Sequence, residues 1–306
     1  MKPHPQVAAL LEAAARSPLP TLDKVSAFVA RRLYRERCEK VKGKALDAQT
    51  RLLLTPGGVP IRSYRPAGSA RNEALPALVF FHGGGWTIGD LDTHDGLCRD
   101  LANGAACEVF SVEYRLAPEA PFPFAVDDCI AATQFVSTIS NCIAVGGDSA
   151  GGNLAAVVAL HARDAGGPTL CLQLLIYPAT DQNMETESLR RNGQDYMLTL
   201  PLMERFRANY LPRAADYSDW RASPALAKSH AGLPPAFVLT AGFDPLLDEG
   251  REYAQLLARA GVDVEYRDYP DMIHGFILMT GVLDTARAAV ADCSAALRRA
   301  FDKVTA

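Results

Sequence analysis

Residues 142–154 read CIAVGGDSAGGNL, a short run rich in β-branched side chains that gives way to glycines and then to a helix-forming segment. This order predicts a strand, a sharp turn and a helix, with Ser149 at the turn. Gly147 and Gly151 flank the serine in the pattern G-x-S-x-G, where a side chain at either glycine would collide with the turn. Such a turn places the hydroxyl over a helix N-terminus. There the backbone N–H groups and the helix dipole stabilise the negative charge that develops on a substrate oxygen. The alternative is a glycine hinge with this spacing by chance.

Strand-like and helix-like segments alternate along the rest of the chain. Residues 77–81 are continuously apolar, as expected for a central strand covered on both faces, and residues 51–55 and 59–64 predict a hairpin. Alternation of this kind predicts an α/β fold with a mostly parallel eight-stranded sheet flanked by helices. The other expected strands are 109–112, 143–145, 172–176, 236–240 and 262–269, and the expected helices are 92–103, 125–139, 154–163, 248–260 and 283–301.

Two parts of the chain have no place in this sheet. Residues 1 to about 45 carry apolar side chains at three- and four-residue spacings, which predicts two helices before the first strand. Residues from about 180 to about 220 hold one expected helix, 201–210, and no strand, and an insertion of this size predicts a lid or cap. We therefore expect residues 1–306 to form a single α/β domain with a helical cap built from these two segments.

Composition excludes several classes of protein. Lys and Arg number 31 against 35 Asp and Glu, a net charge of -4, so we expect no nucleic-acid partner. The apolar run from Val7 to Ala15 is interrupted by Glu12, and it is too short for membrane insertion; with no targeting segment visible, we expect a cytoplasmic protein. The scattered cysteines include no C-x-x-C pair, which predicts reduced thiols and no metal site. They are Cys38, Cys98, Cys107, Cys129, Cys142, Cys171 and Cys293.

A serine nucleophile needs a base, and the base needs a carboxylate that orients it. In sheets of this kind the order along the chain is serine, acid, histidine. His274 alone among the histidines follows the strand that should deliver the acid, and it lies just after the last expected strand. Asp244 lies in the segment at the carboxyl end of the strand 236–240, whereas Asp248 has the place of a helix N-cap, so we favour Asp244 as the acid. We expect Asp148 to bind loop backbone.

Several motifs, in this order, resemble the hormone-sensitive-lipase family of α/β-hydrolases, the bacterial family IV carboxylesterases in the subgroup with GDSAG. The resemblance runs from about Leu75 to Leu278. It departs from the family at Leu247, where relatives often carry Arg. The motifs are HGGGW at 82–86, YRLAPE at 114–119, GDSAGGN at 147–153, DPL at 244–246 and IHGF at 273–276.

The resemblance implies a catalytic triad, an oxyanion hole and no cofactor. The triad would be Ser149, Asp244 and His274. The oxyanion hole would be formed by N–H groups of Gly83, Gly84, Gly85 and Ala150. It also implies that the helical cap covers the site and that His82 orients the glycines rather than moving protons.

These expectations describe a serine carboxylesterase that hydrolyses short- to medium-chain esters through an acyl-enzyme. An amide or peptide hydrolase would use the same triad, and comparison of matched ester and anilide substrates separates the two. A ligand-binding receptor of the same fold is the alternative from another class, but such receptors lack the catalytic histidine, which is present here as His274.

The last expected strand, from Val262 to Tyr269, alternates apolar and charged residues, which is typical of an edge strand. Its charges of both signs suit either protection of the edge or pairing with a second copy of the chain. We expect a homodimer through this strand, as similar esterases form.

Overall fold

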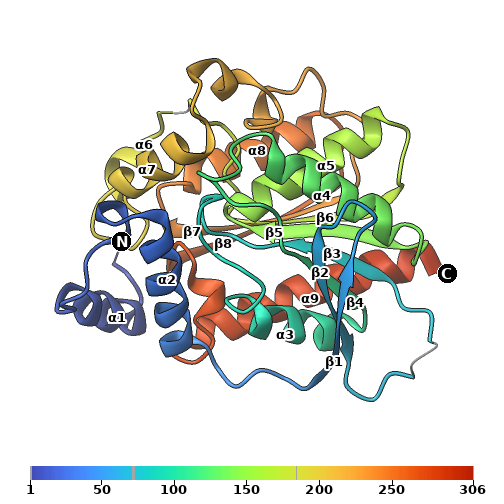
Figure 1. The fold of residues 1–306 in the computed structure, drawn as a ribbon, viewed down its shortest axis with the longest axis horizontal. Helices are drawn as coiled ribbons and strands as arrows, with labels where there is room; N and C mark the ends of the chain where they lie inside the picture. The colour runs from blue at the N-terminus through green and yellow to red at the C-terminus, as the bar shows by residue number, and fades with distance from the viewer. Residues whose placement is uncertain (1, 71–72, 184, 306) are drawn as a thin grey trace.

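Eight strands form one sheet in the part of the chain that the computed structural model describes, residues 2–70, 73–183 and 185–305 (Figure 1). The order across the sheet is β1-β2-β4-β3-β5-β6-β7-β8. The pairs β1–β2 and β2–β4 are antiparallel and the others are parallel, so the predicted mostly parallel eight-stranded sheet is confirmed. The strands are β1 Ala48–Leu54, β2 Pro60–Pro66, β3 Ala77–Phe81, β4 Glu108–Val112, β5 Ile143–Asp148, β6 Leu170–Ile176, β7 Ala236–Phe243 and β8 Val264–Ile273.

Helices cover both faces of the sheet. Figure 1 shows α4, α5 and α8 on one face and α3 and α9 on the other, and each face has its own buried apolar cluster. The helices are α1 Pro5–Ala15, α2 Ala27–Val41, α3 Asp95–Ala105, α4 Phe124–Val136, α5 Ala150–Asp164, α6 Glu187–Asn192, α7 Leu200–Tyr210, α8 Leu247–Arg259 and α9 Asp284–Thr305. Short 3₁₀ helices lie at Leu22–Lys24, Ala214–Ser218, Pro224–Leu226 and Phe276–Leu278.

The parallel register brings the carboxyl ends of the central strands to one edge. Phe81, the last residue of β3, pairs with Gly147 of β5, which in turn pairs with Leu175 of β6. Each of these strands is buried at its carboxyl end, because helices pack on both faces. The loops that follow β3, β5, β7 and β8 therefore meet at a single edge of the sheet, where α/β folds place their ligand sites.

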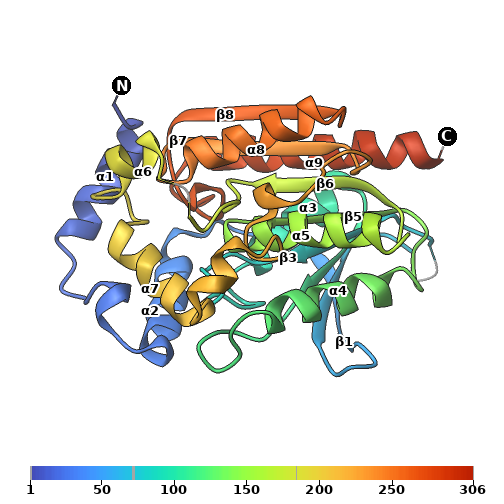
Figure 2. The same ribbon diagram turned by 90° about the horizontal axis from the view of Figure 1, so that it is seen from above.

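Four helices gather at one end of the molecule, beyond the sheet. In both Figure 1 and Figure 2, α1 and α2 lie beside α6 and α7, although the two pairs are far apart in the sequence. A small apolar cluster joins α2 to α7, to the loop after β3 and to the loop after β7. Its buried members are Leu22, Ala30, Leu33, Ile88, Leu198, Leu202, Phe206 and Leu246.

Several predicted element boundaries differ from the observed ones by up to four residues. Helix α3 begins at Asp95 rather than at Asp92, because Asp92 lies in a turn whose N–H groups bind Oδ1 of Asp90. Strand β8 runs from Val264 through Ile273, beyond the predicted end at residue 269, so it ends immediately before His274.

The predicted N-cap role of Asp248 was also wrong. The N-cap of α8 is Leu246, and Asp248 is the second residue of the helix. Its Oδ2 accepts a hydrogen bond from the N–H of Ser188 at 2.7 Å, and its own N–H donates to the Ser188 hydroxyl at 3.1 Å. Asp248 thus anchors α8 to α6. Leu247, the departure from the family pattern, is buried as the first residue of α8.

No helix in the described part of the chain combines the length and the apolar character needed to cross a membrane.

Candidate active site

Ser149 lies in the turn between β5 and α5 with φ 57° and ψ -118°, a conformation that L-residues rarely adopt. The N–H of Ser149 donates to the carbonyl of Ile176 at 2.8 Å, which fixes the turn to β6. A Cβ at Gly147 would overlap the backbone of Gly151, and a Cβ at Gly151 would overlap the carbonyl of Phe81. The prediction that both flanking positions require glycine is confirmed.

The structure brings Ser149, His274 and Asp244 together. The Nε2 atom of His274 lies 2.9 Å from Oγ of Ser149, and Nδ1 of His274 lies 2.7 Å from Oδ2 of Asp244. Asp244 is fully buried, and its second oxygen accepts the N–H of Leu246 at 2.8 Å. One carboxylate oxygen is thereby held by backbone while the other faces the imidazole, which fixes the plane of the ring.

Asp148 precedes the serine and binds the loop after β3, as expected from the sequence. Its Oδ1 accepts the N–H of Gly83 at 2.9 Å and lies 3.1 Å from Nε2 of His94. Burial alone would raise the pKa of Asp148, but the His94 imidazole and the Gly83 N–H hold the pKa below its usual range. Asp148 is therefore an ionised tether for the loop.

The glycine loop, residues 82–89, runs close to other backbone. Gly84, Gly85 and Trp86 have φ values of 121°, 57° and 53°, the left-handed region that favours glycine. A Cβ at Gly84 would overlap the carbonyl of Ile88. Within the described residues no protein group accepts the N–H of Gly84 or Gly85. The Gly83 N–H, by contrast, is engaged by Asp148.

The model of the alpha/beta hydrolase fold family matches residues 78–278, which span the glycine loop, the serine turn and His274. The carboxylic ester hydrolase LipN of Mycobacterium tuberculosis is 43% identical over 90% of this chain and 77% of its own length. The chain belongs to the hormone-sensitive-lipase family of α/β-hydrolases.

Two further similar proteins are also ester hydrolases by name. The ethyl acetate hydrolase of Pseudomonas putida is 37% identical, and the match covers 84% of this chain and 85% of the relative. The solved structure of an ester hydrolase from the metagenome of Lake Arreo has a TM-score of 0.92 at 41% identity, covering 99% of this chain and 100% of that one. The expected activity is confirmed: the chain is a serine carboxylesterase.

His82, the first residue of the family's glycine motif, is fully buried and contacts the backbone of the loop. Its Nδ1 lies 2.8 Å from the carbonyl oxygen of Gly83, and its ring stacks on Tyr114 at 4.2 Å between centroids. The Tyr114 hydroxyl donates to the carbonyl of His82 at 2.6 Å. Burial, together with the nearby His94, lowers the pKa of His82 to about 4, so this imidazole stays neutral near pH 7.

Sequence reasoning missed three residues that contact the site. His94 binds Asp148, Arg31 of α2 binds the glycine loop, and the ring of Tyr177 lies 4.6 Å from that of His274. Tyr177 had a usable signal, because it directly follows a buried strand of the sheet. His94 and Arg31 had none, because their partners lie in distant segments of the chain.

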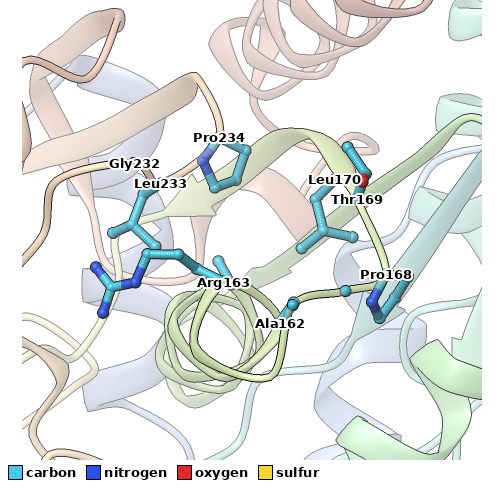
Figure 3. A pocket seen from close by; sticks show the side chains of 11 residues that line it. Ala162, Arg163, Pro168, Thr169, Leu170, Gly232, Leu233 and Pro234 are labelled. Atoms are coloured by element: carbon cyan, nitrogen blue, oxygen red, sulfur yellow. The ribbon is translucent and has the colours of Figure 1, made fainter.

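A separate pocket of about 210 Å³ lies between the end of α5, residues 166–170 and residues 232–234 (Figure 3). It is at the opposite edge of the sheet from Ser149, where β6 and β7 begin. Arg163 is the one charged residue among those that line it, and its guanidinium donates to the carbonyls of Ser229 and Ala231. This pocket brings no nucleophile or base together, so it is not the esterase site.

Proposed function

We propose that this carboxylesterase cleaves short- to medium-chain carboxylic esters through an acyl-enzyme on Ser149. The observation that carries the proposal is the pair of contacts made by one imidazole: His274 Nε2 to Ser149 Oγ at 2.9 Å and His274 Nδ1 to Asp244 Oδ2 at 2.7 Å. A serine, a base and a buried acid in this arrangement are suited to acyl transfer.

In the first step Ser149 Oγ attacks the ester carbonyl while His274 Nε2 takes the hydroxyl proton. Asp244 accepts a hydrogen bond from Nδ1–H and stabilises the imidazolium that forms. His274 then returns the proton to the departing alkoxide, so an alcohol leaves and the acyl group remains on Ser149. Water, deprotonated by His274, repeats the sequence and releases the carboxylic acid.

The oxyanion formed in each step needs donors that are already in place. We assign this role to the N–H groups of Gly84, Gly85 and Ala150. The first two have no protein acceptor among the described residues, and Ala150 opens α5, where N–H groups have no partner within the helix. We leave out Gly83, whose N–H donates to Asp148.

We also propose that residues 1 to about 45 and about 180–220 act as a cap on a single domain of residues 1–306. The cluster that joins α2 to α7 includes Ile88 of the glycine loop and Leu246, two residues after Asp244. An apolar cluster at this place suits contact with the acyl or alcohol chain of a small ester. The name of the Pseudomonas putida relative, an ethyl acetate hydrolase, also favours short chains.

A series of nitrophenyl esters from acetate to palmitate tests the function, with Ser149→Ala as the control. We expect the highest kcat/KM between acetate and octanoate and loss of turnover in the variant. A matched butyryl anilide should react far more slowly than the butyryl ester. A maximum at palmitate, or equal rates on ester and anilide, would contradict the proposal.

The finer expectations on assembly and location are further proposals. Strand β8 ends the sheet, so its outer edge can pair with β8 of a second copy. Light scattering tests the homodimer, and a monomer at high concentration would contradict it. The seven cysteines are free and six of them are buried, which suits a reducing compartment and thus the cytoplasm. Fractionation of the source cells tests that location.

A further inference from the structure

Arg31 of α2 reaches from the N-terminal segment to the backbone of the glycine loop. Its Nε donates to the carbonyl of Thr87 at 2.9 Å, and its Nη2 donates to the carbonyl of Ala117 at 2.9 Å. The same guanidinium forms a two-point ion pair with Glu119, at 3.0 Å and 2.5 Å. Four hydrogen bonds from one planar fork fix its position.

The two carbonyls belong to segments that meet at the glycine loop. The carbonyl of Trp86 accepts the N–H of Ala117 at 2.8 Å, so the loop and the segment 114–119 are already paired beside Arg31. The carbonyl of Gly84 accepts the N–H groups of Thr87 and Ile88, at 3.1 and 2.9 Å. A shift of Thr87 is therefore transmitted within one turn to Gly84, which we assign as an oxyanion donor.

The loop needs external support because its backbone is strained. Gly85 and Trp86 are both left-handed, and Trp86 carries a large side chain in that conformation. Backbone in a strained conformation persists when several contacts with the surrounding structure hold it in place. The Arg31–Glu119 pair is not the main support, because the Glu119 side chain is 62% exposed, and exposed ion pairs contribute little. The bonds to the Thr87 and Ala117 carbonyls are only partly exposed to solvent.

We propose that Arg31 is a positioning residue for the oxyanion hole, acting through the Thr87 and Ala117 carbonyls on the Gly84 and Gly85 N–H groups. This inference rests on the proposed function of those groups. It gives the N-terminal segment a role in the chemical step, beyond that of covering the pocket.

Arg31→Met removes all four bonds at similar length of side chain, and Arg31→Lys keeps the charge without the fork. We expect Arg31→Met to lower kcat roughly 10- to 100-fold with KM within about twofold, because misplaced donors act on the transition state. Arg31→Lys should fall between Arg31→Met and the unmodified protein, because one ammonium cannot replace both carbonyl contacts. Glu119→Gln, which leaves the carbonyl contacts in place, should retain nearly full kcat.

Inhibitors distinguish a positioning role of Arg31 at the oxyanion hole from a general loss of rigidity in the protein. A trifluoromethyl ketone forms an oxyanion on Ser149, so its inhibition constant should rise in Arg31→Met by the same factor as kcat falls. The inhibition constant of a substrate-like amide, which forms no oxyanion, should stay unchanged. Arg37→Met is the matched control: Arg37 lies on the same helix and donates to the carbonyl of Pro20 at 2.9 Å, away from the loop. We expect it to leave kcat unchanged.

The proposal is overturned if Arg31→Met keeps kcat within about twofold, changes only KM, or loses no more than Arg37→Met. If Arg31→Met does not fold, Arg31→Lys decides the matter by the same criteria. Failure of the proposed function would look different, because the unmodified protein would then hydrolyse no ester or Ser149→Ala would keep its activity.

Discussion

The ring of Phe206 on α7 lies directly against Gly85, in the space that a Cβ at position 85 would occupy. Tyr210, one turn further along α7, stacks on Trp86 with ring centroids 4.4 Å apart. The insertion after β6 therefore packs on the glycine loop, and Arg31 of α2 donates to the Thr87 carbonyl of the same loop. The conformation of the loop depends on both segments of the proposed cap.

Gly85→Ala should lower kcat by roughly 10² to 10³, the range for loss of one oxyanion donor. The added methyl meets Phe206, and the backbone at position 85 has φ 57°. Gly58→Ala is the matched control, because Gly58 has φ 83° with open space around it in the β1–β2 turn. Steady-state kinetics should show a large effect at Gly85 alone, and equal kcat values in the two variants would contradict this role.

Ser149→Ala and His274→Ala should each lower kcat by at least about 10⁴, because the two residues act as a unit. For the same reason the double variant should be no slower than the slower single variant. Circular dichroism checks that each protein remains folded. A double variant far slower than either single would show that the two residues act independently.

Asp244→Asn should reduce kcat severely, because the amide no longer favours the tautomer and charge that His274 needs. Asp248→Asn should mainly reduce the free energy of unfolding, since Asp248 binds the backbone N–H of Ser188. Kinetics and urea unfolding on the same two variants separate these effects. The reverse pattern would make Asp248 the acid.

Glu249 is buried on α8 and accepts the N–H of Thr180 at 2.6 Å. Burial raises the pKa of Glu249 from 4.5 to about 8, against the opposing effect of N–H donors at Thr180 and Asp181. The folded state therefore favours the neutral acid. The contribution of Glu249 to the free energy of unfolding is complete below pH 4.5 and is lost as the pH rises to about 8.

Glu249→Gln removes this titration. The variant should gain stability relative to the unmodified protein as the pH rises from 5 to 8, by an amount on the order of a few kcal/mol, and the difference should then stay constant. Urea unfolding of both proteins at pH 5, 7 and 9 measures it. A difference that does not change with pH would show that Glu249 is ionised in the folded protein.

Deletion of residues 1–35 should leave the sheet folded, lower activity and reduce discrimination between acyl chain lengths, because the apolar cluster around Leu202 and Phe206 would lose its α2 partners. Arg31→Met, by comparison, should lower kcat and keep the chain-length preference. The nitrophenyl ester series run on both proteins makes the comparison. Unchanged selectivity in the deletion variant would remove the N-terminal helices from the pocket.

A short sequence pattern explains why the serine turn could be predicted. Gly147 and Gly151 are needed because other backbone lies against them, and the G-x-S-x-G pattern that indicates this need occupies only five consecutive residues. His274 could be placed because a parallel sheet brings its carboxyl ends to one edge, which leaves few histidines eligible. The fold could be predicted because strand-like and helix-like segments alternate along the chain, and each of them is visible in a short stretch of sequence.

Long-range contacts explain what could not be predicted. Arg31 is 56 residues from Thr87 and 86 from Ala117, and an arginine on a helix has the same sequence signature whether it binds a carbonyl or faces water. Three consecutive glycines show that backbone can approach a ligand, but not that Asp148 has taken the N–H of Gly83. The helix start at Asp92 was misplaced because Asp92 lies in a turn whose N–H groups donate to Asp90. The start at Asp248 was misplaced because the carboxylate of Asp248 accepts an N–H of the neighbouring helix α6 rather than of its own helix.

The span of 125 residues between Ser149 and His274 also has a consequence for protein synthesis. The ribosome makes the nucleophile long before its base, and β8, which delivers that base, pairs with β7 only after most of the chain has emerged. Nascent chains and degradation fragments that end before residue 274 therefore carry the serine without a means to activate it. The esterase activity of this protein therefore requires a chain that extends at least through His274.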